Sequence, residues 1–163
     1  MRGRFFEEFQ PGEVVETAGR TVTDEDVMAF ARVSGDDTGL HTDEEFARRG
    51  PFGRRIAHGA LVFSLAIGLT TRTKLVEGTI VAFNRVDNLR FTRPVFIGDT
   101  IRVTKRLLSA DAKTPEAGVL AFDTRVLNQH AEIVLAFVDR LLVKRLVARP
   151  PVAAASGCTL AET

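Results

Sequence analysis

The chain reads IAHGALVFSLAIGL from Ile56 to Leu69, and this stretch decides the fold. After Gly59 its only polar side chain is that of Ser64. A helix that is apolar on all sides must be surrounded by protein. If the helix continues to about Arg72, it is roughly 20 Å long at 1.5 Å per residue. We therefore predict a long central helix that lies across the middle of a sheet.

The residues after this helix have the pattern of strands separated by turns. Residues 133–138 are apolar on both parities, which is typical of a central strand covered on both faces. Lys105 is an exception, because it interrupts the apolar face of its segment. A long apolar helix followed by antiparallel strands predicts an α+β domain, with the helix packed on one sheet face. The predicted strands occupy residues 79–83, 88–92, 101–107, 119–127 and 133–143.

Two shorter helices are expected before the central one. Thr23 can cap a helix that ends near Gly35, and three acidic residues follow this cap where the helix dipole favours negative charge. Thr42 or Asp43 can cap a second helix, which Gly50-Pro51 stops. The residues between these helices are expected to form a loop.

Length, charge and cysteine content limit the class of protein. The 163 residues fit one domain, which we place at 1–148, with a disordered tail at 149–163. The net charge of +1 argues against a dedicated nucleic-acid or anionic-membrane surface, and the longest apolar segment is too short to span a bilayer. The N-terminus turns acidic where a signal peptide would become apolar, and Cys158 has no partner for a disulfide. We therefore expect a cytoplasmic protein.

Asp36 and His41 are the first candidates for chemistry. They are five residues apart in a segment rich in turn formers, so their side chains can converge on one point. A carboxylate beside an imidazole can hold a water molecule and move its proton, because histidine titrates near physiological pH. The same spacing also fits an aspartate that caps a turn beside an ordinary surface histidine. Spacing alone leaves both interpretations open.

Gly59 is a candidate through its backbone. At the first turn of a helix its N–H has no intrahelical partner, so it can bind a thioester carbonyl oxygen that becomes enolate-like. Close packing would explain a glycine here equally well. Ser64 is a further candidate for substrate binding, whereas we expect His58 to be structural. A metal site made of Asp36, His41 and His58 matches no zinc spacing, so no metal is expected.

Taken together, these residues resemble the MaoC-like family of (R)-specific enoyl-CoA hydratases and dehydratases. The family's loop reads Ser-x-Asp-x-Asn-Pro-x-His-x-Asp, and a later Ile-x-His-Gly segment opens its central helix. Here residues 34–43 read SGDDTGLHTD and residues 56–59 read IAHG. The likeness continues through FTRPV at residues 91–95 and GDT at residues 98–100. Thr38 and Gly39 depart from it, because they stand where the family has asparagine and proline.

This resemblance implies a single hot-dog domain, in which an antiparallel sheet wraps a long central helix. It makes Asp36 and His41 the catalytic pair and the Gly59 N–H the oxyanion donor. The implied reaction is reversible addition of water to a trans-2-enoyl thioester, which gives an (R)-3-hydroxyacyl thioester. The thioester is carried by coenzyme A or an acyl carrier protein, and no metal or redox cofactor takes part. A homodimer is also implied, with the acyl tunnel near the subunit interface.

Two other functions remain open at this stage. Hot-dog thioesterases usually place a catalytic carboxylate on or beside the central helix, and residues 60–73 contain no carboxylate. A non-catalytic acyl-CoA-binding protein is the second alternative, against which the Asp36/His41 pair argues.

Overall fold

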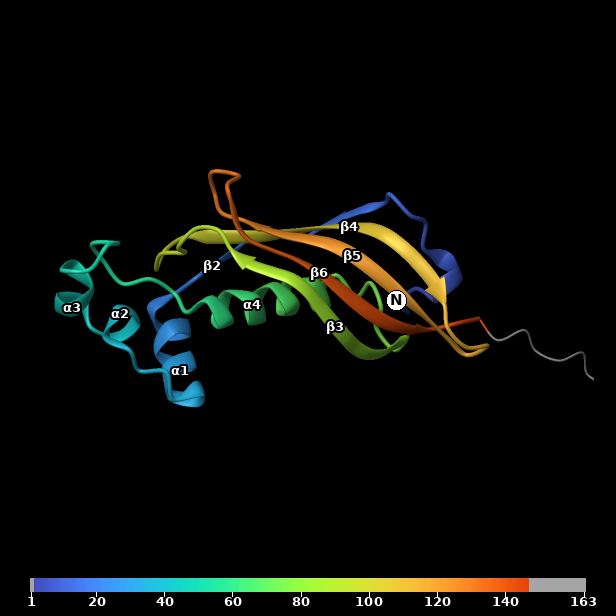
Figure 1. Cartoon of the computed structure of the whole chain (residues 1–163), viewed down its shortest axis with the longest axis horizontal. Helices are drawn as coiled ribbons and strands as arrows, with labels where there is room; N and C mark the ends of the chain where they lie inside the picture. The colour runs from blue at the N-terminus through green and yellow to red at the C-terminus, as the bar shows by residue number, and fades with distance from the viewer. Residues whose placement is uncertain (1, 147–163) are drawn as a thin grey trace, which may run out of the picture.

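A six-stranded antiparallel sheet and one long helix, α4 (Gly59–Arg72), form the two layers of the molecule (Figure 1). This computed structural model describes residues 2–146, and the predicted tail at 149–163 lies outside the described residues. The predicted α+β class and the antiparallel sheet are confirmed. Within the described part of the chain, every helix falls short of the length and apolarity that crossing a membrane requires.

The sheet has the order β1-β4-β5-β6-β3, and β2 pairs with β4. All of its pairings are antiparallel. Because β3 pairs only with β6, its other edge carries no strand within residues 2–146. The strands are β1 (Val14–Glu16), β2 (Arg20–Thr21), β3 (Ile80–Phe91), β4 (Thr100–Ala112), β5 (Ala117–Leu127) and β6 (Ile133–Lys144).

Strand β3 joins two segments that the sequence analysis predicts separately. Its pairing with β6 shifts register at three places, and each shift marks a bulge or irregularity. One of them spans Asn88, whose φ is +54°. Asparagine tolerates this left-handed conformation better than most residues. The strand therefore passes through the mostly polar residues 84–87, where the sequence pattern indicates a break.

Helix α4 has the predicted bounds, and it packs its apolar side against one face of the sheet. It is not surrounded by protein within the chain, which corrects the prediction. Ala60, Ser64 and Gly68 are exposed, and their spacing of four residues places them on one stripe. The buried side chains are those of Leu61, Val62, Leu65, Ala66 and Leu69.

Strand β6 lies between β5 and β3, as expected of a central strand, but only one of its faces is fully covered. On the other face Ala136, Val138 and Leu142 are half-buried, so the prediction of burial on both faces is wrong for the single chain. The prediction assumed that a strand with apolar residues on both parities is buried on both faces. In the described chain, however, α4 packs against one face of the sheet only.

Three short helices gather at one end of the molecule, around the start of α4 (Figure 1). The predicted helices are α1 (Asp24–Ser34) and α3 (Glu44–Arg48), capped by Thr23 and Asp43. Between them the expected loop contains a further turn of helix, α2 (Gly39–Thr42). The 3₁₀-helix η1 (Phe6–Glu8) lies at the opposite end of the molecule. The predicted catalytic loop is thus held between two capped helices.

Candidate active site

The end of α1 places Asp36 beside the start of α4. Gly35 caps α1 with a φ of +76°, a conformation that glycine adopts without strain, and its N–H donates to the carbonyl of Ala31. The hydroxyl of Ser34 then accepts a hydrogen bond from the N–H of Asp36 at 3.2 Å. The chain therefore turns sharply between Ser34 and Asp36 and leaves the helix in a fixed direction.

Thr38 orients the carboxylate of Asp36. Its hydroxyl donates to Oδ1 of Asp36 at 2.7 Å, and its backbone N–H reaches the same oxygen at 3.4 Å. The hydroxyl hydrogen bond is the main reason that the pKa of Asp36 lies below its ordinary value of 3.8. The carboxylate is therefore ionised at neutral pH, and it forms no ion pair with lysine or arginine among residues 2–146. The threonine that departs from the family pattern thus has a definite role in this loop.

His41 lies in α2, and a backbone carbonyl determines which of its nitrogens is free. Its Nδ1 lies 2.8 Å from the carbonyl oxygen of Ile56. Because a carbonyl can only accept, Nδ1 carries the proton and donates it to this bond. In the neutral imidazole the Nε2 atom then has the free lone pair. The geometry therefore presents His41 as a proton acceptor.

His58 supports both members of this pair. It is only 2% exposed, and its Nε2 donates to the carbonyl oxygen of Asp36 at 2.9 Å. Its ring stacks on that of His41, with the centroids 3.9 Å apart and an angle of 30° between the planes. The ring of Phe30 also packs against the ring of His58, with the centroids 5.0 Å apart. These contacts agree with the structural role expected of His58.

Asp36, His41 and His58 each place one ligand atom within 4.8 Å of the other two. A single water molecule can bridge two atoms at this separation with hydrogen bonds of about 2.8 Å each. The same three side chains could instead hold a cation, although their sequence spacing matches no zinc pattern. Nδ1 of His58 is buried without a hydrogen-bond partner among the described residues. Because Nε2 of His58 is bonded to the carbonyl of Asp36, Nδ1 is the nitrogen that remains for a cation.

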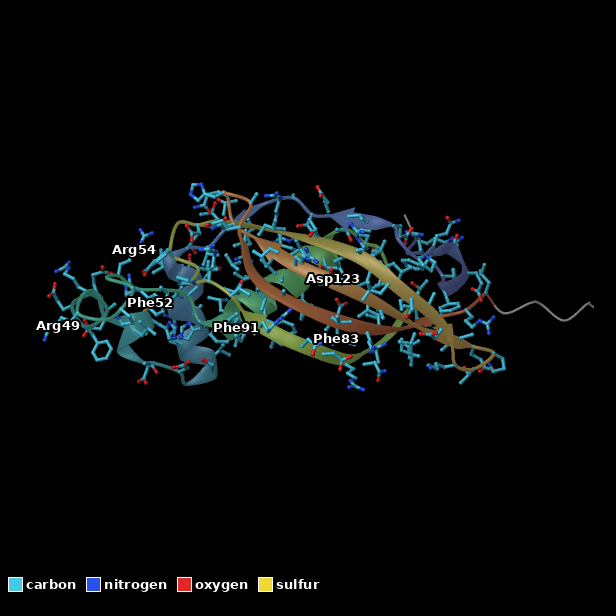
Figure 2. All side chains as sticks on the ribbon, turned by 45° about the horizontal axis from the view of Figure 1, so that its top comes forward. Arg49, Phe52, Arg54, Phe83, Phe91 and Asp123 are labelled. Atoms are coloured by element: carbon cyan, nitrogen blue, oxygen red, sulfur yellow. The ribbon has the colours of Figure 1, made fainter. Side chains whose placement is uncertain are left out.

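A cavity of about 560 Å³ adjoins this group, and both His41 and Gly59 line it. Gly59 is the first residue of α4, so its N–H lies in the turn that has no intrahelical acceptor. A Cβ on Gly59 would lie 2.8 Å from the ring of Phe91, so a larger residue does not fit without movement. Phe91 and Phe52, both labelled in Figure 2, line the cavity as well. Its volume suits a small-molecule ligand.

Comparison with known proteins identifies the family. A family model described as "MaoC like domain" matches residues 7–120, which is more than half of the chain. The chain belongs to the MaoC-like dehydratase family. The matched region contains Asp36, His41 and Gly59.

Individual members of the MaoC-like family agree with this assignment. The 3-hydroxyacyl-thioester dehydratase Z of Mycobacterium tuberculosis is 37% identical over 92 residues, or 56% of this chain and 61% of that protein. Protein MaoC of Klebsiella aerogenes is 38% identical over 120 residues, or 69% of this chain. The match covers only 35% of that protein. The chain thus spans between about one third and three fifths of these relatives.

Solved structures confirm the hot-dog fold. A structure from Archaeoglobus fulgidus, described as a monoamine oxidase regulatory protein, has a TM-score of 0.84 and 36% identity, and the match covers 90% of this chain and 97% of that one. The R-hydratase PhaJ1 of Pseudomonas aeruginosa has a TM-score of 0.73 and 30% identity, with 91% and 95% covered. A double-hotdog protein of Mycobacterium tuberculosis, 21% identical, shares the fold at a TM-score of 0.78, covering 98% of this chain and 53% of that one.

One predicted site residue does not join the others in this MaoC-like chain. Ser64 is exposed on the outer stripe of α4, and its hydroxyl donates to the carbonyl of Ala60 at 2.9 Å. It is absent from the lining of the cavity that contains His41 and Gly59. A hydroxyl that bonds back to its own helix is common for a serine in mid-helix. The structure therefore brings together Asp36, His41 and Gly59 but not Ser64.

Arg55 is a positioning residue that the sequence analysis does not select. Its guanidinium bridges Asp24 of α1, at 2.6 Å, and Glu44 of α3, at 3.2 Å. It also lies 3.5 Å from the carbonyl oxygen of His41. Arg55 therefore ties together the two helices that flank the loop. Its position three residues before His58 is only a weak sequence signal that Arg55 belongs to the site. Its ion-pair partners become apparent only in the fold.

Gly39 is the second departure from the family pattern, and its reason is steric. A Cβ at this position would lie 2.8 Å from the ring of Phe46 in α3. The sequence analysis notes only that glycine stands here where the family has proline. In the structure Gly39 opens α2 and allows the ring of Phe46 to pack against its backbone. Contact between Phe46 and the backbone of Gly39 therefore holds the loop at the position where the family has the rigid ring of proline.

Proposed function

We propose that this chain catalyses the reversible hydration of a trans-2-enoyl thioester to an (R)-3-hydroxyacyl thioester. The observation that carries the proposal is the convergence of Asp36 and His41 beside a cavity that Gly59 lines. Two relatives, one named as a 3-hydroxyacyl-thioester dehydratase and one as an R-hydratase, support the same reaction class. The acyl chain would occupy the cavity of about 560 Å³.

In this mechanism the carboxylate of Asp36 and Nε2 of His41 hold one water molecule between them. As the water oxygen bonds to C3 of the substrate, the pair removes one of its protons. Charge moves to the thioester oxygen, where the Gly59 N–H and the helix dipole stabilise it. The pair then returns a proton to C2 on the same face, so that the addition is syn. Dehydration follows the same steps in reverse.

The proposed reaction uses no metal and no redox cofactor. The competing use of the site is a cation held by Asp36, His41 and His58, whose ligand atoms lie within 4.8 Å of one another. A bound cation would consume the lone pair of His41 that the hydration mechanism needs. Full activity after exhaustive treatment with a chelator supports the metal-free mechanism. Loss of activity that Zn²⁺ or Mn²⁺ restores would favour the metal site.

We infer a homodimer from the open edge of the sheet. Strand β3 has no second neighbour within the described chain, and it exposes five large apolar side chains. Exposed apolar edges of this kind mark interaction surfaces. Light scattering is expected to give twice the chain mass, and Val81→Lys, which adds charge to the edge, is expected to give a monomer. The five side chains are those of Ile80, Val81, Phe83, Leu89 and Phe91.

The experiment that tests the function uses crotonyl-CoA. The loss of enoyl absorbance reports hydration, and chiral analysis of the product is expected to give the (R)-3-hydroxy isomer. A thiol reagent added in parallel separates the alternatives. Release of free CoA without loss of the enoyl group would show a thioesterase. Binding without either reaction, across enoyl-CoAs of varied length and branching, would show an acyl-CoA-binding protein.

A further inference from the structure

The segment between α3 and α4 holds the loop that carries Asp36 and His41. The carbonyl oxygen of Ile56 accepts a hydrogen bond from Nδ1 of His41 at 2.8 Å, and the N–H of Ile56 donates to the carbonyl of Leu40 at 3.4 Å. His58 donates to the carbonyl of Asp36 at 2.9 Å. The orientation of both proposed catalytic groups therefore depends on where this segment lies.

The same segment is fixed on two sides. Toward the connection between β3 and β4, the N–H of Ala57 donates to the carbonyl of Val95 at 2.8 Å, and Ile56 forms an isolated antiparallel bridge with Phe96. On the other side lie the short helices α1, α2 and α3 (Figure 1), and Arg55 contacts all three. Arg55 is therefore the charged anchor of the segment.

The guanidinium of Arg55 uses a different nitrogen for each helix. Nη2 donates to Asp24 at 2.6 Å, Nε donates to Glu44 at 3.2 Å, and Nη1 lies 3.5 Å from the carbonyl oxygen of His41. The side chain of Arg55 is 19% exposed, whereas those of Asp24 and Glu44 are 57% and 49% exposed. The planar fork of arginine can donate in several directions at once, which the point charge of lysine cannot match. A single side chain thus joins α1, α2 and α3.

Two like charges meet at Arg55. Asp24 is the first residue of α1 and Glu44 is the first residue of α3, so each carboxylate lies where the helix dipole favours negative charge. Without the guanidinium the two carboxylates would face the same point, and like charges repel. Arg55 therefore sets the spacing of α1 and α3, and the turn of helix that carries His41 lies between them in the chain.

We propose that Arg55 is a positioning residue for the hydration reaction and that it sets the turnover number through His41. By joining the three helices it keeps Nδ1 of His41 on the carbonyl of Ile56, so that Nε2 stays directed at the water. Arg55 does not line the active-site cavity, so its loss is expected to change kcat and not KM. A displacement of about 1 Å caused far from the chemistry costs about 10²-fold in rate. This role rests on the proposed hydratase function, because the turnover of that reaction is what Arg55 controls.

Steady-state kinetics with crotonyl-CoA test the role of Arg55. Arg55→Met keeps the stem and removes the guanidinium, and it is expected to lower kcat about tenfold to a hundredfold with KM nearly unchanged. The melting temperature should fall only slightly, because Asp24 and Glu44 are about half exposed. Arg55→Lys is expected to recover part of the loss. The matched control is Arg54→Met, because Arg54, labelled in Figure 2, stacks on the ring of Phe96 at 3.9 Å. An unchanged kcat in Arg55→Met would overturn the proposal.

The acidic partners test the same contact from the other side, also in the case that Arg55→Met does not fold. Asp24→Asn and Glu44→Gln each remove one bond to Arg55, and each is expected to lower kcat less than Arg55→Met does. The combination of both should approach the effect of Arg55→Met. Glu45→Gln is the matched control, because Glu45 pairs with Arg48 on the exposed surface. Full turnover in the combined variant would refute the role of Arg55.

A spectroscopic measurement separates positioning from a general loss of stability. The chain has only three histidines, so ¹⁵N-labelled histidine gives few signals, and protonated and free ring nitrogens differ clearly in chemical shift. His41 of the unmodified protein is expected to carry its proton on Nδ1. Arg55→Met should give a mixture of both tautomers, and Arg54→Met should not. If His41 keeps the same tautomer and shifts in Arg55→Met, Arg55 does not position it.

The NMR measurement needs no substrate, so failure of this role and failure of the hydratase function can be distinguished. If crotonyl-CoA is hydrated equally by the unmodified protein and by Arg55→Met, only the role of Arg55 is refuted. If no enoyl-CoA is hydrated, but His41 changes its tautomer in Arg55→Met and not in Arg54→Met, the hydratase function is refuted and the positioning of His41 by Arg55 stands.

Discussion

The two ends of α4 each hold a carboxylate near a nitrogen base, and they use this chemistry in opposite ways. At the N-terminal end Asp36 is exposed and has no lysine or arginine partner within the described part of the chain, and the neutral ring of His41 has a free lone pair beside a cavity. At the C-terminal end Asp139 is fully buried and neutralised by Lys105. The comparison shows that burial and pairing decide whether such a cluster can exchange protons or only hold the fold and offer hydrogen bonds.

The largest effect is expected at the exposed cluster. Replacing His41 by Ala removes the proton acceptor, and Asp36→Asn removes the charge that holds the water. Each change is expected to lower the turnover of crotonyl-CoA by about 10²- to 10⁴-fold while the melting temperature stays nearly constant. His130→Ala is the matched control, because His130 is exposed and lies outside the active-site cavity. Near-normal turnover in either of the first two variants would sink the assignment.

The buried cluster should respond in stability. Lys105→Met leaves the carboxylate of Asp139 buried without its cation, and removal of one partner from a buried pair costs about 3–5 kcal/mol. We expect a loss of this size in urea unfolding, with turnover of crotonyl-CoA per folded molecule unchanged. The additional change Asp139→Leu should recover much of the loss. A large fall in turnover without a change in stability would reverse the roles of the two clusters.

An intermediate effect is expected at Gly59. The Cβ of Gly59→Ala would lie 2.8 Å from the ring of Phe91, which must move into the cavity or displace the start of α4. We expect kcat/KM for crotonyl-CoA to fall about tenfold or more, in line with disturbance of one oxyanion donor. Adding Phe91→Ala removes the clash but keeps the N–H. Recovery of activity in this double variant supports a role for the backbone N–H of residue 59. If activity does not recover, glycine is needed at this position for packing alone.

The smallest effect concerns the pKa of Asp36. The Thr38 hydroxyl stabilises the charged carboxylate and so lowers this pKa below its ordinary value of 3.8. Thr38→Val removes that hydrogen bond, so the pKa should rise and the carboxylate should take up its proton at higher pH. A carbon-detected NMR titration of the Asp36 carboxyl group measures the shift directly. An unchanged or lower pKa would show that Thr38 does not control the ionisation.

Much of the fold can be predicted from sequence because local signals agree there. Thr23 and Gly35 mark both ends of α1, and the apolar run after Gly59 gives the bounds of α4. Strand β3 is an exception, because its bulges depend on pairing with β6, which no local pattern encodes. The outer stripe of α4 is another, since an apolar sequence does not reveal which side the sheet leaves open. Lys105 looks like a defect until Asp139, 34 residues away, is placed beside it.

In the candidate site, too, some features can be predicted from local sequence and others depend on distant contacts. Asp36, His41 and Gly59 can be selected by residue type, spacing and family likeness. Their partners cannot be predicted, because the tautomer of His41 depends on the carbonyl of Ile56, fifteen residues away. Ser64 was selected as the one polar residue in an apolar helix, but its side chain follows the helix period to the exposed stripe. Whether it takes part in substrate binding remains a prediction.

The central claim is that Asp36 and His41 act as one unit on a single water molecule, and a double-mutant cycle tests it most directly. Turnover of crotonyl-CoA is measured for Asp36→Asn, His41→Ala and the combination of both. If the two groups share one water, the double variant should be about as slow as the slower single variant, because residues that act as a unit are strongly non-additive. A double variant whose loss equals the product of the two single losses would contradict the account.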